Sequence, residues 1–386
     1  MIVAVPAETH PAEKRVALIP ASVAALIKAK LEVRVQSGAG VAAGFSDQQY
    51  IAAGATIVGS RSEAFAADVV LQVRAAGANP TAGRADLPLM HRDLTIIGMC
   101  DPLGEPQAAV ELAAAGVTLL SLELLPRITR AQSMDVLSSQ ATVAGYRAVL
   151  LAAVTLPKLF PMMITAAGTL SAARVLIVGA GVAGLQAIAT ARRLGAVVSA
   201  YDVRPAVKEQ VQSLGAKFVE MPLETASAEA SGGYAQQMDE AFYAKQRELM
   251  GRVVAESDVV ITTAAVPGKK SPVLVTAEMV ARMTPGSVIV DLAAERGGNC
   301  ELTKAGETVV VNGVTILGPT DLPAEVPQHA SQLYAKNITT FLLYLVKEGH
   351  LILDAEDEIV RETLVVRGGE VVNPRIKQLL TPAASA

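Results

Sequence analysis

The sequence predicts an α/β protein with two Rossmann-like parallel-sheet domains separated by a cleft, the first domain being discontinuous. Three observations predict this architecture. Short apolar runs rich in β-branched residues alternate with segments of helical spacing along most of the chain. One of these runs leads into a G-x-G-x-x-G turn. The chain has 386 residues, enough for two domains, and is 51% hydrophobic but only 3% aromatic, which favours tightly packed α/β layers.

The N-terminal domain is expected to cover residues 1–138 and to be completed by about 329–386. Its strand-like and helix-like segments alternate, as in a parallel sheet with crossover helices. Residues 38–44 resemble a dinucleotide turn, but their spacing is G-x-G-x-x-x-G and no suitably placed acid follows, so an ordinary loop is favoured. Helices are predicted over 20–30 and from Ser46, and strands over 1–6, 31–36, 56–59, 69–73, 94–99 and 117–123.

Two segments near the end of the sequence complete this domain in the prediction. Residues 328–347 have strong helical spacing, and a helix there most simply returns to the N-terminal domain and makes it discontinuous. Residues 358–367 and 370–374 predict a short hairpin or tail.

A polar segment precedes the second domain. Residues 124–140 read LLPRITRAQSMDVLSSQ and hold two arginines, two glutamines and one aspartate between apolar elements. A helix is predicted to start near Asp135 or Ser138 and to run to about 156, where Pro157 interrupts the pattern. An ordinary surface linker is the simpler interpretation, but this density of hydrogen-bonding groups favours a functional loop.

The second domain, residues 139–328, contains a dinucleotide-binding fingerprint. A buried strand is predicted over 175–178, a glycine-rich turn follows, and a helix covers 185–194. A second strand over 197–201 leads directly to Asp202. Strand, turn, helix, second strand and acid fall in the expected order, which distinguishes this segment from a glycine turn that binds nothing.

Each glycine of the turn has a separate physical role. Gly179 permits the tight turn, Gly181 lets the backbone approach a pyrophosphate, and Gly184 lets helix and strand pack closely. The helix N-terminus offers N–H groups and its positive dipole end to the phosphates.

Asp202 predicts which dinucleotide is bound. It lies 18 residues beyond Gly184, close to the spacing of about 20 for the acid that binds the ribose 2′-hydroxyl. A carboxylate accepts hydrogen bonds from a diol and repels a 2′-phosphate, so the predicted ligand is NAD(H) rather than NADP(H). Arg204 is able to contact a phosphate, but Asp202 beside it argues against one.

The rest of the second domain contains a segment of unusual composition. Residues 222–239 are rich in Ala, Ser, Glu and Gly and are interpreted as a mobile loop, in which Gly233 supplies hinge freedom and Tyr234 acts as a lid. An insertion without a role is the alternative. Strands are predicted over 217–221, 259–263 and 288–292, and a helix over 240–256.

Composition excludes several classes of partner. The formal net charge of −4 provides no basic footprint, so no nucleic-acid partner is expected. Cys100 and Cys300 lie far apart without metal-ligand spacing, which favours a reduced cytosolic chain and predicts no metal site. The first residues lack the pattern of a signal peptide, and the longest apolar run, 148–156, is too short to span a membrane.

Over essentially its whole length the chain resembles two related families, alanine dehydrogenase and the NAD(H)-binding component (domain I) of proton-translocating NAD(P) transhydrogenase. The likeness runs from the initial MIVAVP and the KRVAL segment around Arg15 to residues 291–299. Alanine dehydrogenases use an Arg, a Lys, a His and an Asp at the amino-acid site. Arg15 matches the first, whereas Arg74, Asp101 and Glu295 stand at the other three positions. A guanidinium does not act as an amine at neutral pH, and an aspartate is a poor substitute for a histidine acid/base, so this site looks dismantled.

The motifs of the transhydrogenase component are present. Residues 127–140 resemble its Arg-Gln-Asp loop, and residues 232–234 (GGY) resemble its mobile loop. Members with a fused alpha subunit continue into membrane helices, so the chain resembles the separate alpha-1 subunit.

This resemblance implies direct hydride transfer, NADH + NADP⁺ ⇌ NAD⁺ + NADPH. NAD(H) would be held by this chain and NADP(H) by a partner subunit, while membrane-spanning subunits couple the reaction to proton translocation. A homodimer is implied as well, located in the cytoplasm and attached to the inner membrane through its partners. Hydride transfer needs no acid/base residue, so the protein contributes positioning and exclusion of water.

The resemblance also assigns the site residues. The catalytic positions that orient the nicotinamide are Arg127, Gln132, Asp135 and Ser138. Gln132 would in addition bridge to the nicotinamide ribose held by the partner. The pyrophosphate and adenosine ends are assigned to Gly179, Gly181, Val182, Gly184, Asp202, Val203 and Arg204. Further nucleotide contacts are expected from Ile128, Thr129, Arg130, Gly233, Tyr234, Gln246 and Ala265.

Two other functions stay open at this point. One is an NAD-dependent amino-acid dehydrogenase like alanine dehydrogenase. The other is a non-catalytic NAD-sensing module whose polar loop recognises a protein partner. The four histidines, His10, His91, His329 and His350, lie in no recognisable motif and are interpreted as structural or surface residues.

Overall fold

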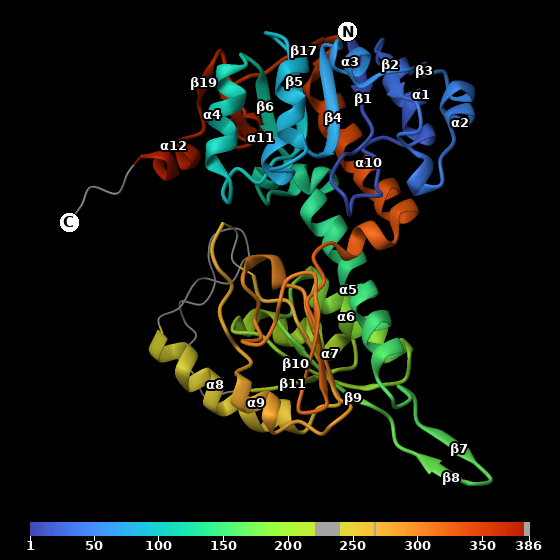
Figure 1. Ribbon diagram of the computed structural model, residues 1–386, viewed down its shortest axis with the longest axis vertical. Coiled ribbons are helices and arrows are strands. Elements are labelled where there is room, and N and C mark those ends of the chain that lie inside the picture. Colours follow the sequence, from blue (N-terminus) through green and yellow to red (C-terminus); the bar gives the residue numbers. More distant parts are fainter. Residues whose placement is uncertain (221–239, 266–267, 382–386) are drawn as a thin grey trace. The chain divides into compact units, whose positions relative to one another are not determined.

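The chain folds into two compact units, seen here in a computed structural model that describes residues 1–220, 240–265 and 268–381. Unit 1 comprises Met1–Gln140 and Pro323–Ala386, and unit 2 comprises Ala141–Leu322 (Figure 1). The predicted α/β class, with two parallel-sheet domains and a discontinuous first domain, is confirmed.

Unit 1 is built on an eight-stranded sheet in the order β19-β18-β6-β5-β4-β1-β2-β3. The strands from the N-terminal region pair in parallel, whereas the C-terminal hairpin adds β18 antiparallel to β6. Central strand β4 is buried along almost its whole length, which explains its continuous apolar sequence. The strands are β1 (Ile2–Val5), β2 (Glu32–Gln36), β3 (Thr56–Val58), β4 (Val69–Arg74), β5 (Thr95–Met99), β6 (Thr118–Ser121), β18 (Leu364–Arg367) and β19 (Glu370–Val371).

The helices of unit 1 begin at residues that favour helix starts. Pro20 opens α1 and Pro106 opens α4, where a missing N–H costs nothing, and Ser46 forms a capping box with Gln49 ahead of α2. The helices are α1 (Pro20–Lys28), α2 (Asp47–Ala52), α3 (Arg61–Phe65), α4 (Pro106–Ala114), α10 (Pro327–Leu345), α11 (Glu358–Thr363) and α12 (Pro374–Leu380). A two-stranded ribbon, β16 (Val346–Lys347) with β17 (His350–Leu351), follows α10.

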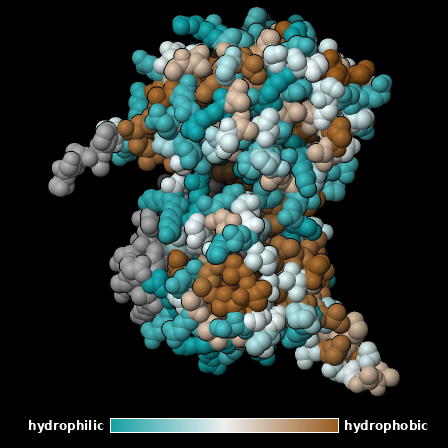
Figure 2. All heavy atoms as spheres, viewed as in Figure 1, coloured by the Kyte–Doolittle hydropathy of each residue, from teal (hydrophilic) through white to brown (hydrophobic). Residues whose placement is uncertain are grey.

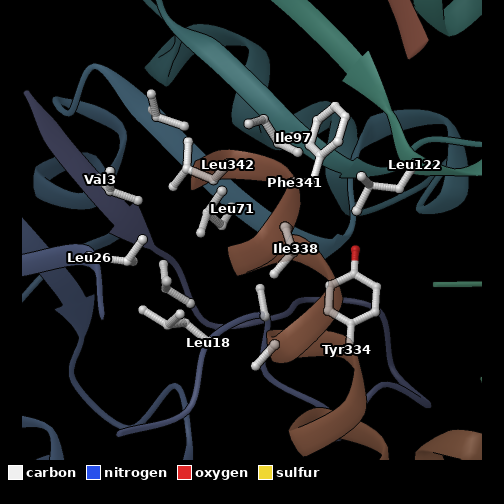
Figure 3. Close-up of a cluster of buried hydrophobic side chains, with 14 of the residues drawn as sticks. Val3, Leu18, Leu26, Leu71, Ile97, Leu122, Tyr334, Ile338, Phe341 and Leu342 are labelled. Atoms are coloured by element: carbon white, nitrogen blue, oxygen red, sulfur yellow. The ribbon is translucent and has the colours of Figure 1, made fainter. Parts of the chain in front are cut away.

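The predicted C-terminal helix packs into one of the hydrophobic clusters of unit 1. Figure 3 shows Ile338, Phe341 and Leu342 of α10 pointing toward Leu71 of β4 and its neighbours. The hydroxyl of Tyr334 donates to the carbonyl of Gln72 (2.8 Å), so this buried phenol is satisfied. Each such fully buried apolar side chain contributes roughly 1.5–3 kcal/mol, which explains why residues far apart in sequence form one unit.

Two sequence predictions for unit 1 are corrected by the structure. Residues 358–363 form helix α11 rather than part of a hairpin, because the Asp357 carboxylate caps it by accepting from the N–H of Ile359 (2.8 Å). The hairpin itself is β18–β19. Strand β6 ends at Ser121, and Leu122–Leu124 form a 3-10 turn instead of continuing the strand to residue 123.

Unit 2 has a seven-stranded sheet in the order β11-β10-β9-β12-β13-β15-β14. The first six strands of this order are parallel and correspond to the 3-2-1-4-5-6 order of a dinucleotide-binding fold, while β14 adds an antiparallel edge. The strands are β9 (Arg174–Val178), β10 (Val197–Tyr201), β11 (Lys217–Phe218), β12 (Val259–Thr262), β13 (Val288–Asp291), β14 (Thr308–Val311) and β15 (Val314–Leu317). The helices are α6 (Val182–Arg193), α7 (Lys208–Ser213), α8 (Glu240–Ala255) and α9 (Ala277–Ala281).

Helix α5 (Val136–Thr155) runs from the end of unit 1 into unit 2, close to the predicted span. It approaches α6 closely, since a Cβ on Gly145 would lie 2.1 Å from the carbonyl oxygen of Ala183. A hairpin that the sequence did not reveal, β7 (Met163–Thr165) with β8 (Gly168–Leu170), follows α5. Figure 2 shows hydrophobic residues on the surface of this hairpin, where Ile164 is 71% and Leu170 50% exposed.

Candidate functional site

The turn between β9 and α6 in unit 2 is shaped by its glycines. Gly179 has a φ of +100°, and a Cβ on it would lie 2.5 Å from Thr263 Oγ1. A Cβ on Gly184 would lie 1.9 Å from the carbonyl oxygen of Gly179, so only glycine lets α6 pack this closely. A Cβ on Gly181 meets only Arg204 Nη2, at 4.0 Å. The backbone at Gly181 can therefore be approached closely, as a pyrophosphate requires.

Helix α6 starts directly at this turn. Its first residue is Val182, which is 36% exposed, and Gly181 before it provides no side-chain cap. The N–H groups of the first helical turn therefore remain available, together with the positive end of the helix dipole. The residues of the turn fit the diphosphate of a dinucleotide.

Asp202 follows β10 and lies next to the glycine turn. Its carboxylate accepts from the N–H of Ala180 (2.7 Å) and from the N–H of Arg204 (2.9 Å). The Arg204 guanidinium donates to the same carboxylate through Nε (2.9 Å) and Nη2 (2.8 Å). Asp202 is 8% exposed, and Val203 and Arg204 keep intermediate exposure. The structure thus gathers Gly179, Gly181, Asp202 and Arg204 in one place.

The end of β12 carries a polar clamp that sequence analysis missed. Asn299 Oδ1 accepts from the N–H of Ala264 (3.0 Å), while Asn299 Nδ2 donates to the carbonyls of Ala264 and Pro272 (both 2.8 Å). The N–H of Asn299 donates to buried Asp291 (2.8 Å), so the clamp is anchored in β13. It fixes the segment before Ala265, which is exposed. The sequence shows that Asn299 follows a predicted strand, but it does not show which backbone groups Asn299 bonds to.

Gln246, another predicted contact, is placed differently. It is 1% exposed, and its Nε2 donates to the Tyr201 hydroxyl (2.8 Å) behind the end of β10. Its Oε1 has no hydrogen-bond partner among the described residues. Gly233 and Tyr234, the predicted hinge and lid, lie outside the described residues.

Unit 1 contributes a separate pocket of about 320 Å³ in the polar loop. The loop folds as a 3-10 helix, Thr129–Met134, directly before α5. Arg127 and Gln132 are exposed, so their polar groups are accessible to a ligand. The pocket is lined by Pro126, Arg127, Ile128, Ala131, Gln132, Asp135 and Ser138.

Asp135 and Ser138 have a structural role in this pocket. Asp135 precedes α5, and its carboxylate accepts from the N–H (2.9 Å) and the hydroxyl (2.5 Å) of Ser138. This is the bond that an N-cap acid makes with the first helical turn. The two side chains therefore hold each other at the pocket wall.

Two of the predicted contacts in this loop do not line the pocket. Arg130 donates to Asp357 (3.1 Å) and to the Tyr344 hydroxyl (3.0 Å) on the surface of unit 1. Thr129 is exposed beside it.

The carboxyl ends of the unit 1 strands carry a charged group of residues that we call the strand-edge cluster: Glu8, Glu13, Arg15, Arg74, Asp101, Glu123 and Gln140. Arg15 is 3% exposed and donates to both Glu13 oxygens (2.7 and 2.6 Å) and to Gln140 (2.9 Å). Arg74 also donates to Glu13 (3.1 Å). Arg15 and Arg74, two positions that the sequence resemblance matches to an amino-acid site, thus share one carboxylate, whereas Glu295 lies exposed in unit 2.

Burial and neighbouring charges shift the pKa values of three acids in the strand-edge cluster. Burial and the charge of Glu13 raise the pKa of Glu8 to about 8, although Glu8 accepts from the N–H groups of Val73 and Arg74. Burial also acts to raise the pKa of Glu13, but bonds from Arg15 and the charge of Arg74 outweigh it and hold that pKa below its usual value. Burial raises the pKa of Glu123, which accepts from the N–H groups of Cys100 and Asp101.

Membrane-spanning helices and metal-binding clusters are both absent from the described residues. No helix there is both long and apolar enough to cross a membrane. Within the same residues, no group of three or more His, Cys, Asp or Glu side chains is placed to hold a metal ion.

Comparison with known proteins gives consistent matches. The model of the Alanine dehydrogenase/PNT N-terminal domain matches residues 4–144, and that of the C-terminal domain matches 148–374. The chain is 47% identical over 380 residues to an NAD(P) transhydrogenase alpha-subunit chain of Rhodospirillum rubrum, covering 97% of this chain and 99% of that protein.

Two solved structures are similar over nearly the whole chain. The transhydrogenase from Sinorhizobium meliloti has a TM-score of 0.86 at 47% identity, covering 96% of this chain and 100% of that one. An L-alanine dehydrogenase has a TM-score of 0.81 at 27% identity, covering 98% and 99%. The resemblance inferred from the sequence motifs is confirmed.

Proposed function

The chain belongs to the alanine dehydrogenase/PNT family, and on that premise we propose that it is the NAD(H)-binding component of a proton-translocating NAD(P) transhydrogenase. The reaction is NADH + NADP⁺ ⇌ NAD⁺ + NADPH, with NADP(H) held by a partner subunit. The 47% identity to a transhydrogenase alpha-subunit chain supports this activity over that of the more distant alanine dehydrogenases.

The observation that carries the choice is the strand-edge cluster. An amino-acid dehydrogenase needs a group that binds the substrate carboxylate and a group that exchanges a proton near neutral pH. Here Arg15 and Arg74 both donate to the single carboxylate of Glu13, and by the sequence resemblance Asp101 stands where alanine dehydrogenases have their histidine. The glycine turn of unit 2 keeps the full dinucleotide fingerprint, so the proposal combines a dinucleotide site in unit 2 with a disabled amino-acid site in unit 1.

Each unit has its own proposed roles, which follow from the geometry described above. In unit 2, Gly179, Gly181, Val182 and Gly184 hold the pyrophosphate, and Asp202 with Val203 binds the adenosine ribose. In unit 1, Arg127 and Gln132 orient the nicotinamide, and Asp135 with Ser138 keeps the loop in shape. When bound, NAD(H) supplies or accepts the hydride. The residues of this chain position it and exclude water, so no acid/base group is required.

Gly233, Tyr234, Gln246 and Ala265 complete the proposed site. Ala265 follows the segment held by Asn299, whereas Gln246 acts through Tyr201 at the end of β10. Ile128 lines the pocket of unit 1, and Thr129 and Arg130 remain as proposed contacts from its outer side.

The assembly belongs to the same proposal. Membrane-spanning partner subunits carry out proton translocation, and the chain is attached through them to the cytoplasmic side of the inner membrane. A homodimer is the form that the family resemblance implies. The exposed apolar side chains of the β7–β8 hairpin support burial of that hairpin against another protein surface.

Three measurements on the purified chain test this function. We expect NADH to bind, alanine with NAD⁺ to give no turnover, and an NAD analogue to be reduced by NADPH once an NADP(H)-binding transhydrogenase component is added. Turnover of alanine, or of pyruvate with ammonium and NADH, by the chain alone would establish the dehydrogenase instead. Tight NADH binding without any transfer to the partner would establish an NAD-sensing module.

A further inference from the structure

The carboxylate of Asp202 is already saturated by donors of its own chain. A carboxylate has about four lone-pair positions that accept hydrogen bonds. In Asp202, Oδ1 accepts from the N–H and Nε of Arg204, and Oδ2 accepts from the N–H of Ala180 and from Nη2 of Arg204. A ribose diol therefore has to replace some of these donors before it can bond to the acid.

The guanidinium is the donor that can leave. The N–H groups of Ala180 and Arg204 belong to the glycine turn and to the chain after β10, so the fold fixes them. The guanidinium stands at the end of a flexible side chain that retains 12% exposure, against 5% for the Asp202 side chain. Rotation of the Arg204 side chain frees two acceptor positions on the carboxylate, which is what a ribose diol needs.

The position of the guanidinium gives it a second property. Its Nη2 is the nearest atom to a Cβ built on Gly181, at 4.0 Å, so it lies against the turn that is shaped for phosphates. An arginine fork is the protein group best suited to a phosphate, but one paired with a carboxylate contributes little net charge to an incoming anion. By pairing with the guanidinium, Asp202 thus prevents Arg204 from binding a phosphate.

We propose that Arg204 is a specificity-determining residue of the nucleotide site, masked by Asp202, and that NADH is preferred over NADPH because of the pair rather than the acid alone. Binding of the adenosine ribose exchanges the Arg204 guanidinium for two ribose hydroxyls on Asp202. Removal of the acid releases Arg204 for the 2′-phosphate of NADPH. This inference rests on the proposed NAD(H) site and concerns how that site selects its dinucleotide.

The test compares NADH and NADPH binding to the full chain, followed by nucleotide fluorescence, in four proteins: wild type, Asp202→Asn, Arg204→Met and the double variant. Asp202→Asn keeps one oxygen to accept from Ala180, and far-UV circular dichroism with thermal unfolding confirms that each variant folds. Arg193→Met is the matched control, because it removes the same charge from an exposed residue at the far end of α6.

We expect Asp202→Asn to weaken NADH binding and to tighten NADPH binding, each by about tenfold, the scale of a charge-assisted hydrogen bond. The gain in NADPH affinity should vanish in the double variant. Arg204→Met should bind NADH at least as tightly as wild type and should not gain NADPH affinity, and Arg193→Met should change neither.

The outcomes separate the inference from the function it rests on. If the wild type does not bind NADH, the proposed function itself is wrong. If the wild type binds NADH but Asp202→Asn gains no NADPH affinity, or keeps its gain without Arg204, only the masking role of Asp202 is overturned. A loss of NADH affinity in Arg204→Met of more than about threefold would show that the guanidinium supports the ribose rather than giving way to it.

Discussion

The two parallel sheets of this protein differ sharply at the edges where their strands end. In unit 1 the strand-edge cluster fills that edge with charged side chains that bond to one another, as Arg15 and Arg74 do to Glu13. In unit 2 the corresponding edge carries the glycine turn before α6, whose first N–H groups have no side-chain cap, next to the bonded pair of Asp202 and Arg204. The charged side chains at the edge of unit 1 use one another as partners, whereas the start of α6 in unit 2 leaves N–H donors for a ligand. The difference supports the proposal that unit 2 binds the dinucleotide and that unit 1 contributes through its loop before α5.

The largest expected effect lies in the strand-edge cluster and concerns stability. Glu13→Gln should lower the free energy of unfolding by about 4 kcal/mol, because it leaves Arg15 buried without its carboxylate. Urea denaturation measures this change. Glu32→Gln is the matched control, since it breaks an exposed pair with Arg34 and should have an effect below about 0.5 kcal/mol. Equal effects of the two substitutions would contradict the assigned role of Glu13.

The next effect concerns binding in unit 2. Gly184→Ala should weaken NADH binding about 100-fold, because its Cβ would lie 1.9 Å from the Gly179 carbonyl oxygen and force the turn apart. Gly59→Ala adds the same methyl group where nothing lies within 4 Å, and it should leave NADH affinity unchanged. Both are measured by NADH fluorescence titration. An unchanged affinity in Gly184→Ala would remove the glycine turn from the site.

The partly buried acid Glu8 predicts a pH dependence of stability. Its pKa is about 8 in the folded protein, above the ordinary 4.5, so the folded state holds a proton that the unfolded state releases. The stabilisation is complete below about pH 4.5 and is lost as the pH rises through 8. Between about pH 6 and 8 the loss should be about 1.5 kcal/mol, after allowance for the partial exposure of Glu8.

Glu8→Gln isolates this contribution. Its free energy of unfolding, measured by urea denaturation at each pH, should vary less between about pH 6 and 8 than that of the wild type. If the two curves run parallel over this range, the raised pKa of Glu8 is wrong.

The smallest effect tests the loop of unit 1. Gln132→Ala should slow hydride transfer to the partner component about tenfold and change the NADH dissociation constant by less than about threefold. The reason is that Gln132 is exposed in the pocket, where in the proposal it orients the nicotinamide and contributes little to NADH affinity. Ser133→Ala, on the same turn but outside the pocket lining, is the control. If Gln132→Ala lowered NADH affinity and the rate of hydride transfer by similar factors, unit 1 would contribute to the binding affinity of the dinucleotide as well.

The features that follow from local patterns were predictable from the sequence. The β9–α6 turn and Asp202 were predicted from the spacing of the three glycines and of the acid that follows them. Helix α5 was predicted because Pro157 ends an apolar helical pattern. The start of that helix near Asp135 was predicted as well, whereas the N-cap bond between Ser138 and Asp135 was not. The β7–β8 hairpin was missed because each strand has only three residues, too few for an alternation to be recognised.

The features that depend on tertiary placement were not predictable. Nothing in the sequence around Glu8 or Glu123 shows that each accepts from two consecutive backbone N–H groups at the end of a neighbouring strand. Arg204 was assigned to the adenosine end of the site, but its pairing with the Asp202 carboxylate was not predicted, because saturation of that carboxylate depends on side-chain geometry. The spacing of residues in the sequence identifies the elements of a site, whereas only the three-dimensional structure shows which charged side chains pair with one another.

The central claim is that hydride passes directly from a dinucleotide held by this chain to one held by a partner. It is tested by supplying NADH with deuterium at the transferred position of its nicotinamide, together with NADP⁺ and the NADP(H)-binding component, and analysing the NADPH by mass spectrometry. The account predicts that the NADPH carries the deuterium, with none lost to water. Unlabelled NADPH, or no NADPH at all although NADH is bound, would contradict it.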